Sequence, residues 1–249
     1  MNKRISVSII HQLSRTGGTV FAKILGNSRE ILVLSEVHPS RRGRDIREQC
    51  LKFHKIAIPK SIDSYTDCIS FLEEHTTKKI IIRDLSHQDF LFRRCSLNAL
   101  SVKTLADRFM LNRLALVRNP VDQFLSMMNF APIKKYMSFE VFCRGYIAFN
   151  HSIEGVPIIR YEDLIRYPEE VLRTTSSALN INISSASLNA FHANTKITGD
   201  NAKDGSRGIE LKELRALPQR QLYSETREKM RKCFMNKHWN RNINFIWVS

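Results

Sequence analysis

The chain has 249 residues, of which 43% are hydrophobic, and a formal net charge of +15 at pH 7. This length and apolar content exclude a disordered or collagen-like chain and are typical of a folded domain, so we expect a single domain over 1–249. The positive charge favours an anionic partner, which nucleic acid, an anionic membrane, an acidic polymer or a polyphosphorylated cofactor would each satisfy.

The cysteine content and the start of the chain indicate a cytoplasmic protein. The chain has five cysteines: Cys50, Cys68, Cys95, Cys143 and Cys233. Their odd number and the lack of CxxC spacing argue against a zinc site and a disulfide framework, and favour a reducing compartment. The apolar stretch after Met1–Arg4 is interrupted by polar residues and lacks a small-residue cleavage site, so it does not indicate a signal peptide. No apolar run approaches the roughly 18 residues of a membrane-spanning helix.

Apolar strands alternate with helices along the chain. The predicted strands are 5–13, 31–36, 79–87 with its exit loop, 113–117 and 156–161, and the predicted helices are 20–24, 44–54, 61–76, 120–129 and 138–153. Strands that are apolar throughout and separated by helices indicate an α/β fold, with a parallel central sheet flanked by helices on both faces. Ligands of such sheets lie beyond the carboxyl ends of the strands. We therefore expect Arg15–Thr19, Glu36–His38, Arg83–His87 and Arg118 to lie at one rim.

The loop after the first strand is suited to hold an anion. It contains five candidate residues: Arg15, Thr16, Gly17, Gly18 and Thr19. The two glycines let the backbone approach a ligand closely, the threonine hydroxyls and the first amides of the following helix are donors, and the arginine adds positive charge. The loop has the architecture of a P-loop. No Gly-Lys-Ser/Thr follows at the required place, which disfavours a nucleoside triphosphatase.

A second segment, Arg118–Ser126, follows the fourth strand and begins a helix with Pro120, at the position where proline is best tolerated. Arg118 ends the strand and Ser126 lies two helical turns later, so a guanidinium fork and a hydroxyl can reach one phosphate. The alternative is structural: Arg118 pairs with Asp122, and Ser126 is a small packing residue.

Together these segments resemble the sulfotransferase family, which transfers a sulfuryl group from 3′-phosphoadenosine-5′-phosphosulfate (PAPS) to an acceptor. Arg15–Thr19 is similar to the family's Lys/Arg-Ser/Thr-Gly-x-Thr motif, and Arg118–Ser126 matches the fixed letters of its Arg-x-Pro-x-Asp-x-x-x-Ser motif. Tyr161–Leu164, followed by Pro168, is similar to the family's Tyr-Glu-Asp-Leu segment after the fifth strand. The resemblance covers roughly residues 5–210 and implies a P-loop nucleotide-kinase-like architecture.

The resemblance also implies which residues bind PAPS. The 5′-phosphosulfate would lie on Arg15–Thr19, with Arg15 neutralising charge on the transferred group, and the 3′-phosphate on Arg118 and Ser126. The adenine would lie near Tyr161, the product would be adenosine 3′,5′-bisphosphate, and no metal is implied. Many members carry lysine at the position of Arg15. Many also close the site with an Arg-Lys-Gly loop. Arg207–Gly208 is the candidate here, with an ordinary surface loop as the alternative because the lysine is missing.

Sulfuryl transfer resembles phosphoryl transfer and needs a base for the acceptor hydroxyl. Glu36 is the first candidate because it follows the second strand, where the glycosaminoglycan and protein-tyrosine branches of the family carry a catalytic glutamate. The alternative is that Glu36 pairs with Arg41 or Arg83 and holds the loop. His38 and His87 are predicted at the same rim and are the other candidates. No His, Asp and Glu cluster has the spacing of a metal site.

Two other functional classes fit parts of the pattern. A P-loop kinase would share the fold, with Asp84 as its metal ligand, but the Walker lysine is missing. A nucleic-acid-binding protein is supported by charge alone, because no helix-turn-helix, zinc finger, RNP-type motif or basic arm is present.

The acceptor is expected to be a hydroxyl compound, on a small molecule, a glycan or a peptide. Its pocket is expected to be built from 40–75, 86–110 and 130–150. The run Arg41–Arg44 favours an anionic acceptor if it lines the entrance, and says nothing about the acceptor if the following helix carries it outward.

Overall fold

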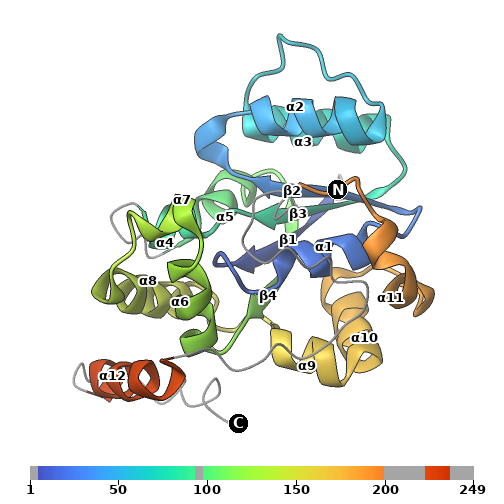
Figure 1. The fold of residues 1–249 in the computed structure, drawn as a ribbon. Coiled ribbons are helices and arrows are strands. Elements are labelled where there is room, and N and C mark those ends of the chain that lie inside the picture. Colours follow the sequence, from blue (N-terminus) through green and yellow to red (C-terminus); the bar gives the residue numbers. More distant parts are fainter. Residues whose placement is uncertain (1–4, 93–97, 199–221, 236–249) are drawn as a thin grey trace.

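A computed structural model describes residues 5–92, 98–198 and 222–235 of the chain. Its centre is a five-stranded sheet in the order β2-β3-β1-β4-β5, and every neighbouring pair is parallel (Figure 1). The strands are β1 (Ser6–Gln12), β2 (Ile31–Val37), β3 (Lys79–Asp84), β4 (Met110–Val117) and β5 (Ile158–Arg160). The predicted α/β fold with a parallel central sheet is confirmed.

Helices cover both faces of the sheet and its carboxyl end (Figure 1). One face carries α1 (Gly18–Leu25), α9 (Tyr161–Arg166), α10 (Pro168–Leu179) and α11 (Ala186–Ala190). The other carries α2 (Arg44–Gln49), α3 (Tyr65–His75) and α5 (Leu100–Leu105). Towards the carboxyl ends of the strands lie α4 (His87–Phe90), α6 (Pro120–Met128), α7 (Ala131–Lys134), α8 (Phe139–Ser152) and α12 (Tyr223–Met235). There are short turns at η1 (Pro39–Arg41), η2 (Cys50–His54) and η3 (Phe191–Ala193).

Successive side chains of the strands fill two opposite cores. In β1, Ile9 packs with residues of α2, α3 and α5, whereas Ile10 packs with residues of α1 and α10. In β3, Ile82 packs in the same core as Ile9, and Ile81 packs in the same core as Ile10. Because neighbouring side chains of a strand point to opposite faces, a strand buried on both faces needs an uninterrupted apolar run. The continuous apolar runs of the sequence follow from this packing.

Two of the long helices begin directly after a serine that caps them. Ser64 Oγ accepts a hydrogen bond from Asp67 N at 3.0 Å at the start of α3, and Ser138 Oγ accepts one from Val141 N at 3.2 Å at the start of α8. Each cap satisfies an amide that has no partner within the first helical turn. The caps account for where these helices start.

The helix predicted over 44–54 is interrupted in the structure. It ends at Gln49 and continues as the π-helical turn η2, which Lys55 closes with a φ of 60°. The Gln49 amide accepts from Ser35 N and donates to Ser35 O, both at 2.8 Å, so the helix is fixed to the free edge of β2. The local pattern of the sequence does not contain this long-range contact.

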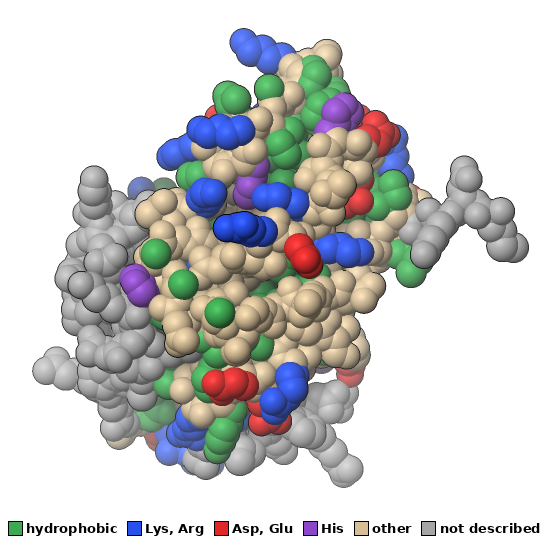
Figure 2. Space-filling view, turned by 90° about the vertical axis from the view of Figure 1, so that its right-hand side faces the viewer, with side chains coloured by type: hydrophobic (Ala, Val, Ile, Leu, Met, Phe, Trp, Pro, Cys, Tyr) green, Lys and Arg blue, Asp and Glu red, His purple; other side chains and the backbone are tan. Residues whose placement is uncertain are grey.

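The positive charge of the chain is not gathered in one place. Figure 2 shows the side of the molecule that carries the amino ends of the strands, opposite the rim at their carboxyl ends. Lys and Arg side chains spread over the upper half of this side, with Asp and Glu among them. Part of the net charge therefore lies away from the predicted rim. In the described ranges, no helix has the length and apolarity needed to cross a membrane.

Replacing Ile9 by Ala should strongly destabilise the protein, because Ile9 is fully buried and its truncation leaves a cavity beneath the sheet. We expect the free energy of unfolding to fall by about 2–5 kcal/mol. Ile5→Ala is the matched control, since Ile5 directly precedes the same strand and is 45% exposed. Urea denaturation measures both losses, and equal losses would contradict the central position of β1.

Candidate active site

The loop between β1 and α1 takes its shape from two glycines. Gly17 has a φ of 89°, in the left-handed region that favours glycine, and a side chain there would overlap the ring of Tyr161. A side chain at Gly18 would overlap the amide of Gln12. The first backbone hydrogen bond of α1 runs from Phe21 N to Gly17 O at 3.1 Å. The amides before Phe21 have no acceptor within the helix, and amides in this position are the donors that helices offer to anions.

Thr16 stabilises the loop from within. Its hydroxyl is buried and donates to Leu13 O at 3.0 Å. A hydroxyl has a single proton, so in this conformation Thr16 donates to the loop itself. The donors that the loop offers outward are then its backbone amides and the partly exposed Thr19 hydroxyl.

Arg15 joins the two predicted anion-binding segments. Its backbone has a φ of 69°, and its Nε donates to Ser126 Oγ at 3.2 Å. Arg118 Nη1 donates in turn to the Arg15 carbonyl at 3.2 Å. The Arg15 guanidinium carbon also lies 5.1 Å from the centroid of the Phe130 ring. The structure thus brings together three of the predicted site residues from segments more than 100 positions apart.

Arg118 lies against Tyr161 and has one unused buried donor. Its guanidinium carbon is 4.9 Å from the centroid of the Tyr161 ring, and the residue is only 7% exposed. Its Nε is buried and has no hydrogen-bond partner within the described part of the chain. Buried donors are nearly always paired in folded proteins, and a guanidinium pairs best with an anionic oxygen. The Arg118 guanidinium is therefore a candidate partner for an anionic oxygen.

Three contacts that the sequence did not predict hold this segment in place. Asn119 N donates to Glu162 Oε1 at 2.8 Å, and Asn119 Nδ2 donates to Tyr223 Oη at 3.0 Å. Gln123 Nε2 donates to the Ser14 carbonyl at 2.7 Å. Glu162 belongs to the predicted Tyr-Glu-Asp-Leu segment, so the sequence contained a signal for it. Tyr223 lies in α12, and no local pattern points to its role.

Glu36 projects from a bulge at the end of β2. Its φ is 59°, and the register between β2 and β3 shifts at this residue. A bulge re-aims a side chain at the edge of a sheet. The Glu36 carboxylate is 36% exposed and pairs with Arg83, with 3.2 Å between Oε1 and Nη2. Of the two predicted partners, Arg83 is the one that Glu36 contacts, whereas Arg41 pairs with Asp45.

Arg83 is a buried cation behind Glu36. Its side chain is 2% exposed, and it donates to Ser35 Oγ at 2.9 and 2.6 Å and to Thr198 O at 2.8 Å. Burial lowers the pKa of Arg83, and the Glu36 carboxylate acts in the opposite direction. Through these contacts, Arg83 stabilises the bulge and orients the Glu36 side chain.

His87 begins α4 beside the anion loop. Its Nδ1 is hydrogen-bonded to Ser14 Oγ at 2.8 Å. Burial lowers the pKa of His87 to about 4, although the carboxylates of Glu36 and Asp84 act to raise it. The imidazole is therefore neutral at pH 7. His87 follows β3 and Glu36 lies at the end of β2, and these strands are paired, so the two candidate bases lie at the same end of the sheet.

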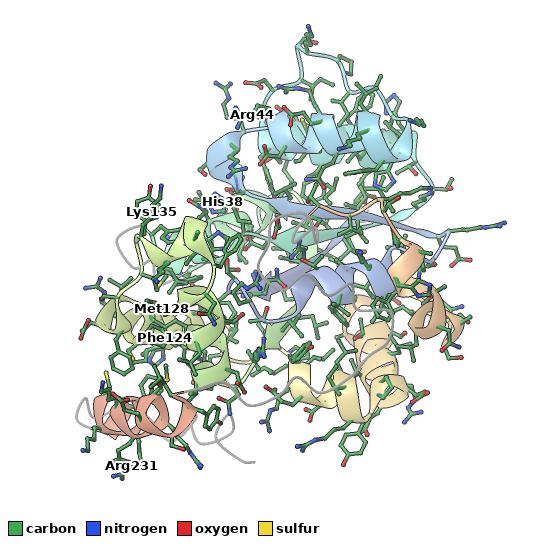
Figure 3. All side chains as sticks on the ribbon, viewed as in Figure 1. His38, Arg44, Phe124, Met128, Lys135 and Arg231 are labelled. Carbon is green, nitrogen blue, oxygen red and sulfur yellow. The ribbon has the colours of Figure 1, made fainter. Side chains whose placement is uncertain are left out.

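His38 is structural. It lies at the same end of the molecule as the carboxyl ends of the strands (Figure 3), but it is only 1% exposed. Its Nδ1 accepts from Ser40 N at 3.2 Å, and its Nε2 lies 3.2 Å from Asp89 Oδ1. Both ring nitrogens are thus engaged within the protein, and these contacts hold the loop after β2 in place.

A buried polar network lies beneath the rim. Asp84 is fully buried and accepts from Ser101 Oγ at 2.7 Å and from Ser86 Oγ at 3.3 Å. His11 Nδ1 lies 3.4 Å from the same carboxylate, and Arg113 Nε donates to His11 Nε2 at 3.0 Å. Hydrogen bonding to Asp84 favours its charged form and lowers its pKa despite burial. Asp84 is thus occupied within the protein and does not reach the rim as a metal ligand.

Two further predictions concern the loop with Arg207–Gly208 and the absence of a metal site. Arg207–Gly208 lies outside the described residues. Thr198 is described, and its hydroxyl donates to Ser35 O at 2.6 Å beside the Glu36 bulge. In residues 5–92, 98–198 and 222–235, no group of three or more His, Cys, Asp or Glu side chains is arranged to hold a metal ion.

Solved structures with the same fold include sulfotransferases. The sulfotransferase domain of the Synechococcus PCC 7002 olefin synthase is 17% identical, with a TM-score of 0.61, and the match covers 94% of this chain and 97% of that one. The sulfotransferase domain of the curacin biosynthetic pathway is 14% identical, with a TM-score of 0.62 and coverage of 91% and 98%. Mouse sulfotransferase SULT7A1 complexed with PAP is 11% identical, with a TM-score of 0.52 and coverage of 97% and 87%. No family profile and no curated protein matches the sequence.

Burial of neutral His87 should make stability depend on pH. Between about pH 4 and 6.5 the unfolded chain binds a proton at His87 that the folded protein does not, so this residue makes the unfolding free energy rise with pH across that window. The contribution is at most about 3 kcal/mol. His87→Gln should flatten the rise, as measured by urea denaturation at several pH values. The exposed His75 provides the control, His75→Gln. An unchanged slope in His87→Gln would contradict the buried, neutral state.

Proposed function

From the sulfotransferase fold of this chain, we propose that it transfers a sulfuryl group from PAPS to the hydroxyl group of an acceptor. The contact between the two anion-binding segments supports this most. Arg15 donates to Ser126, and Arg118 donates back to the Arg15 carbonyl. A ligand with two separate anionic groups on one nucleoside suits two adjoining anion sites better than a ligand with a single phosphate.

Both anionic parts of PAPS find groups of suitable chemistry. The unused Nε of Arg118 and the Ser126 hydroxyl suit the 3′-phosphate. The amides at the start of α1 suit the 5′-phosphosulfate, together with the Arg15 guanidinium. Tyr161 is 6% exposed and its ring packs against Gly17 and the Arg118 guanidinium, so it supports the two segments between which the nucleotide would lie. When bound, PAPS supplies an activated sulfuryl group.

The chain's own residues would then promote an in-line transfer. The acceptor oxygen forms a bond to sulfur as the bond from sulfur to the 5′-phosphate oxygen breaks, Glu36 takes the hydroxyl proton, and adenosine 3′,5′-bisphosphate (PAP) leaves. Arg15 and the α1 amides stabilise the charge that builds on the leaving oxygen. Neutral His87, held by Ser14, can hydrogen-bond the acceptor hydroxyl beside Glu36.

The structure gives less support to the other two classes. A P-loop kinase needs a Walker lysine and a carboxylate that binds Mg²⁺. The loop after β1 lacks the lysine, and the Asp84 carboxylate is buried and hydrogen-bonded to Ser101. A nucleic-acid-binding role was supported by net charge alone, and Lys and Arg side chains also spread over the side opposite the rim (Figure 2).

Arg118→Ala should abolish binding of PAP, because it removes the buried guanidinium that faces the proposed 3′-phosphate. The parent protein should be stabilised by PAP without Mg²⁺ in a thermal-shift assay, and the variant should lose that shift. Arg166→Ala is the matched control, since Arg166 is exposed on the neighbouring α9 and carries the same charge. Stabilisation of the parent only by Mg-ATP would instead establish the kinase.

Glu36→Gln should slow turnover and leave PAP binding intact, because glutamine keeps the shape and the contact with Arg83 but cannot take the proton. We expect kcat to fall by about 10²-fold or more. Transfer of label from ³⁵S-PAPS measures the rate, and Glu48→Gln, an exposed position on α2, is the control. A Glu36→Gln enzyme with the parental rate would remove Glu36 from the role of base.

A further inference from the structure

Resting on the proposed function, we propose that the acceptor is an alcohol or phenol with an uncharged, apolar body that lies against three aromatic side chains beside the reacting groups. These side chains are Phe92, Phe130 and Tyr136, which we call the aromatic wall. The proposal selects one class from the small molecules, glycans and peptides that the sequence left open.

The aromatic wall is connected to both sides of the candidate active site. The Phe92 ring meets His87 edge-on, with 5.3 Å between centroids, and the Tyr136 ring meets Phe92 with 6.1 Å between centroids. On the other side, Phe130 lies 5.1 Å from the guanidinium carbon of Arg15. Phe130 and Tyr136 flank α7, so the aromatic contacts lead from His87 around α7 to Arg15. An acceptor hydroxyl between Arg15 and His87 therefore has aromatic carbon next to the rest of its molecule.

The aromatic wall is exposed on one side and supported by the core on the other. Tyr136 is 61% exposed, and Phe92 and Phe130 are partly exposed. Behind them, Leu91 and Ile133 are buried in the core cluster that includes α6 and α8. Covering exposed apolar surface contributes about 25 cal/mol per Å². Apolar surface with a few polar groups at one end is typical of small-molecule sites, so the wall favours an apolar acceptor.

The arginines after β2 do not favour an anionic acceptor. Four of them pair with two nearby carboxylates at 2.7–3.7 Å: Arg41 and Arg44 with Asp45, and Arg42 and Arg47 with Asp63. Each carboxylate is shared by two arginines, so each group keeps a net charge of +1. The side chains of Arg41, Arg42 and Arg44 are 44–71% exposed, however, and water and salt weaken the attraction of exposed cations for an anion. The sequence favours an anionic acceptor only if this run lines the entrance, and none of these contacts places it there.

Besides Arg15, which lies against Phe130 at the inner end of the aromatic wall, a second positive charge lies at its outer end. Lys135 Nζ is 4.7 Å from the centroid of the Tyr136 ring, and Figure 3 shows Lys135 at the outer edge of the molecule, beyond α7. The rings nearest the reacting groups are Phe92 and Phe130, which carry no polar atom. The side chains of Phe92 and Phe130 offer no hydrogen-bond partner to the hydroxyl groups of a glycan, so they favour an apolar acceptor body.

The first experiment tests the acceptor class by binding. Protein saturated with PAP is titrated with 2-naphthol and 1-octanol as apolar probes, and with N-acetyllactosamine and an acidic tyrosine peptide as polar probes. We expect a further thermal shift with the apolar probes only. Transfer from ³⁵S-PAPS should then favour the apolar probes by at least about tenfold in kcat/KM over the polar ones.

Two pairs of variants test the location. Tyr136→Ala and Phe92→Ala should each weaken binding of 2-naphthol to the PAP-loaded protein about tenfold, because each removes a ring from the aromatic wall. Tyr167→Ala and Phe71→Ala are the matched controls. Tyr167 is 58% exposed between α9 and α10, and Phe71 is partly exposed on α3. The PAP-induced shift should be retained in all four variants.

The outcomes separate this inference from the proposed function. A parent protein that PAP does not stabilise would overturn the proposed function. A parent protein that PAP stabilises, but in which the apolar probes give no further shift or the polar probes are preferred, would overturn the acceptor class alone. Equal weakening in the wall variants and in their controls would show that Tyr136 and Phe92 do not contact the acceptor and would overturn the assignment.

Discussion

The parallel pairing of β1 with β4 is the constraint on which the candidate site depends. Its register places Gln12 opposite Leu116, so the two strands end at the same level of the sheet. The loop after β1 and the segment after β4 therefore leave side by side, and Arg15 contacts both Ser126 and Arg118. The connection from β1 leads to β2 at one edge, and that from β4 leads to β5 at the other. Ligands of open parallel sheets bind where the connections diverge in this way.

Polar residues inside the strands support this rim from below. Arg113 in β4 and His11 in β1 each have a partner in the chain of contacts that ends at Asp84. A buried charge is tolerated only when such partners are present. Ser86, which donates to Asp84, also accepts from Gln12 N, so the network links the exit of β3 to the start of the anion loop. Glu162 fixes the segment after β4 in a similar way through Asn119 N.

Glu36 and His38 show which features of the rim the sequence could not predict. Glu36 and His38 are two positions apart, and both were plausible bases. The bulge turns Glu36 outward with a positive φ, while His38 is buried against Asp89. A bulge depends on the partner strand as well as on local preference, so the local sequence did not show which of the two side chains would be exposed. The same holds for Tyr223, whose contact with Asn119 joins α12 to a motif 104 positions earlier.

By itself, the sequence determined the strands, the turn rich in glycine and the helix that begins at Pro120. These features depend on apolar runs, on the backbone freedom of glycine and on the fixed φ of proline, which act within a few residues. Only the tertiary structure decided which groups meet. It paired Glu36 with Arg83, placed His87 beside Ser14 and set the aromatic wall next to Arg15. These contacts join residues 47 to 115 positions apart along the chain, so they exist only once the order and register of the strands are fixed.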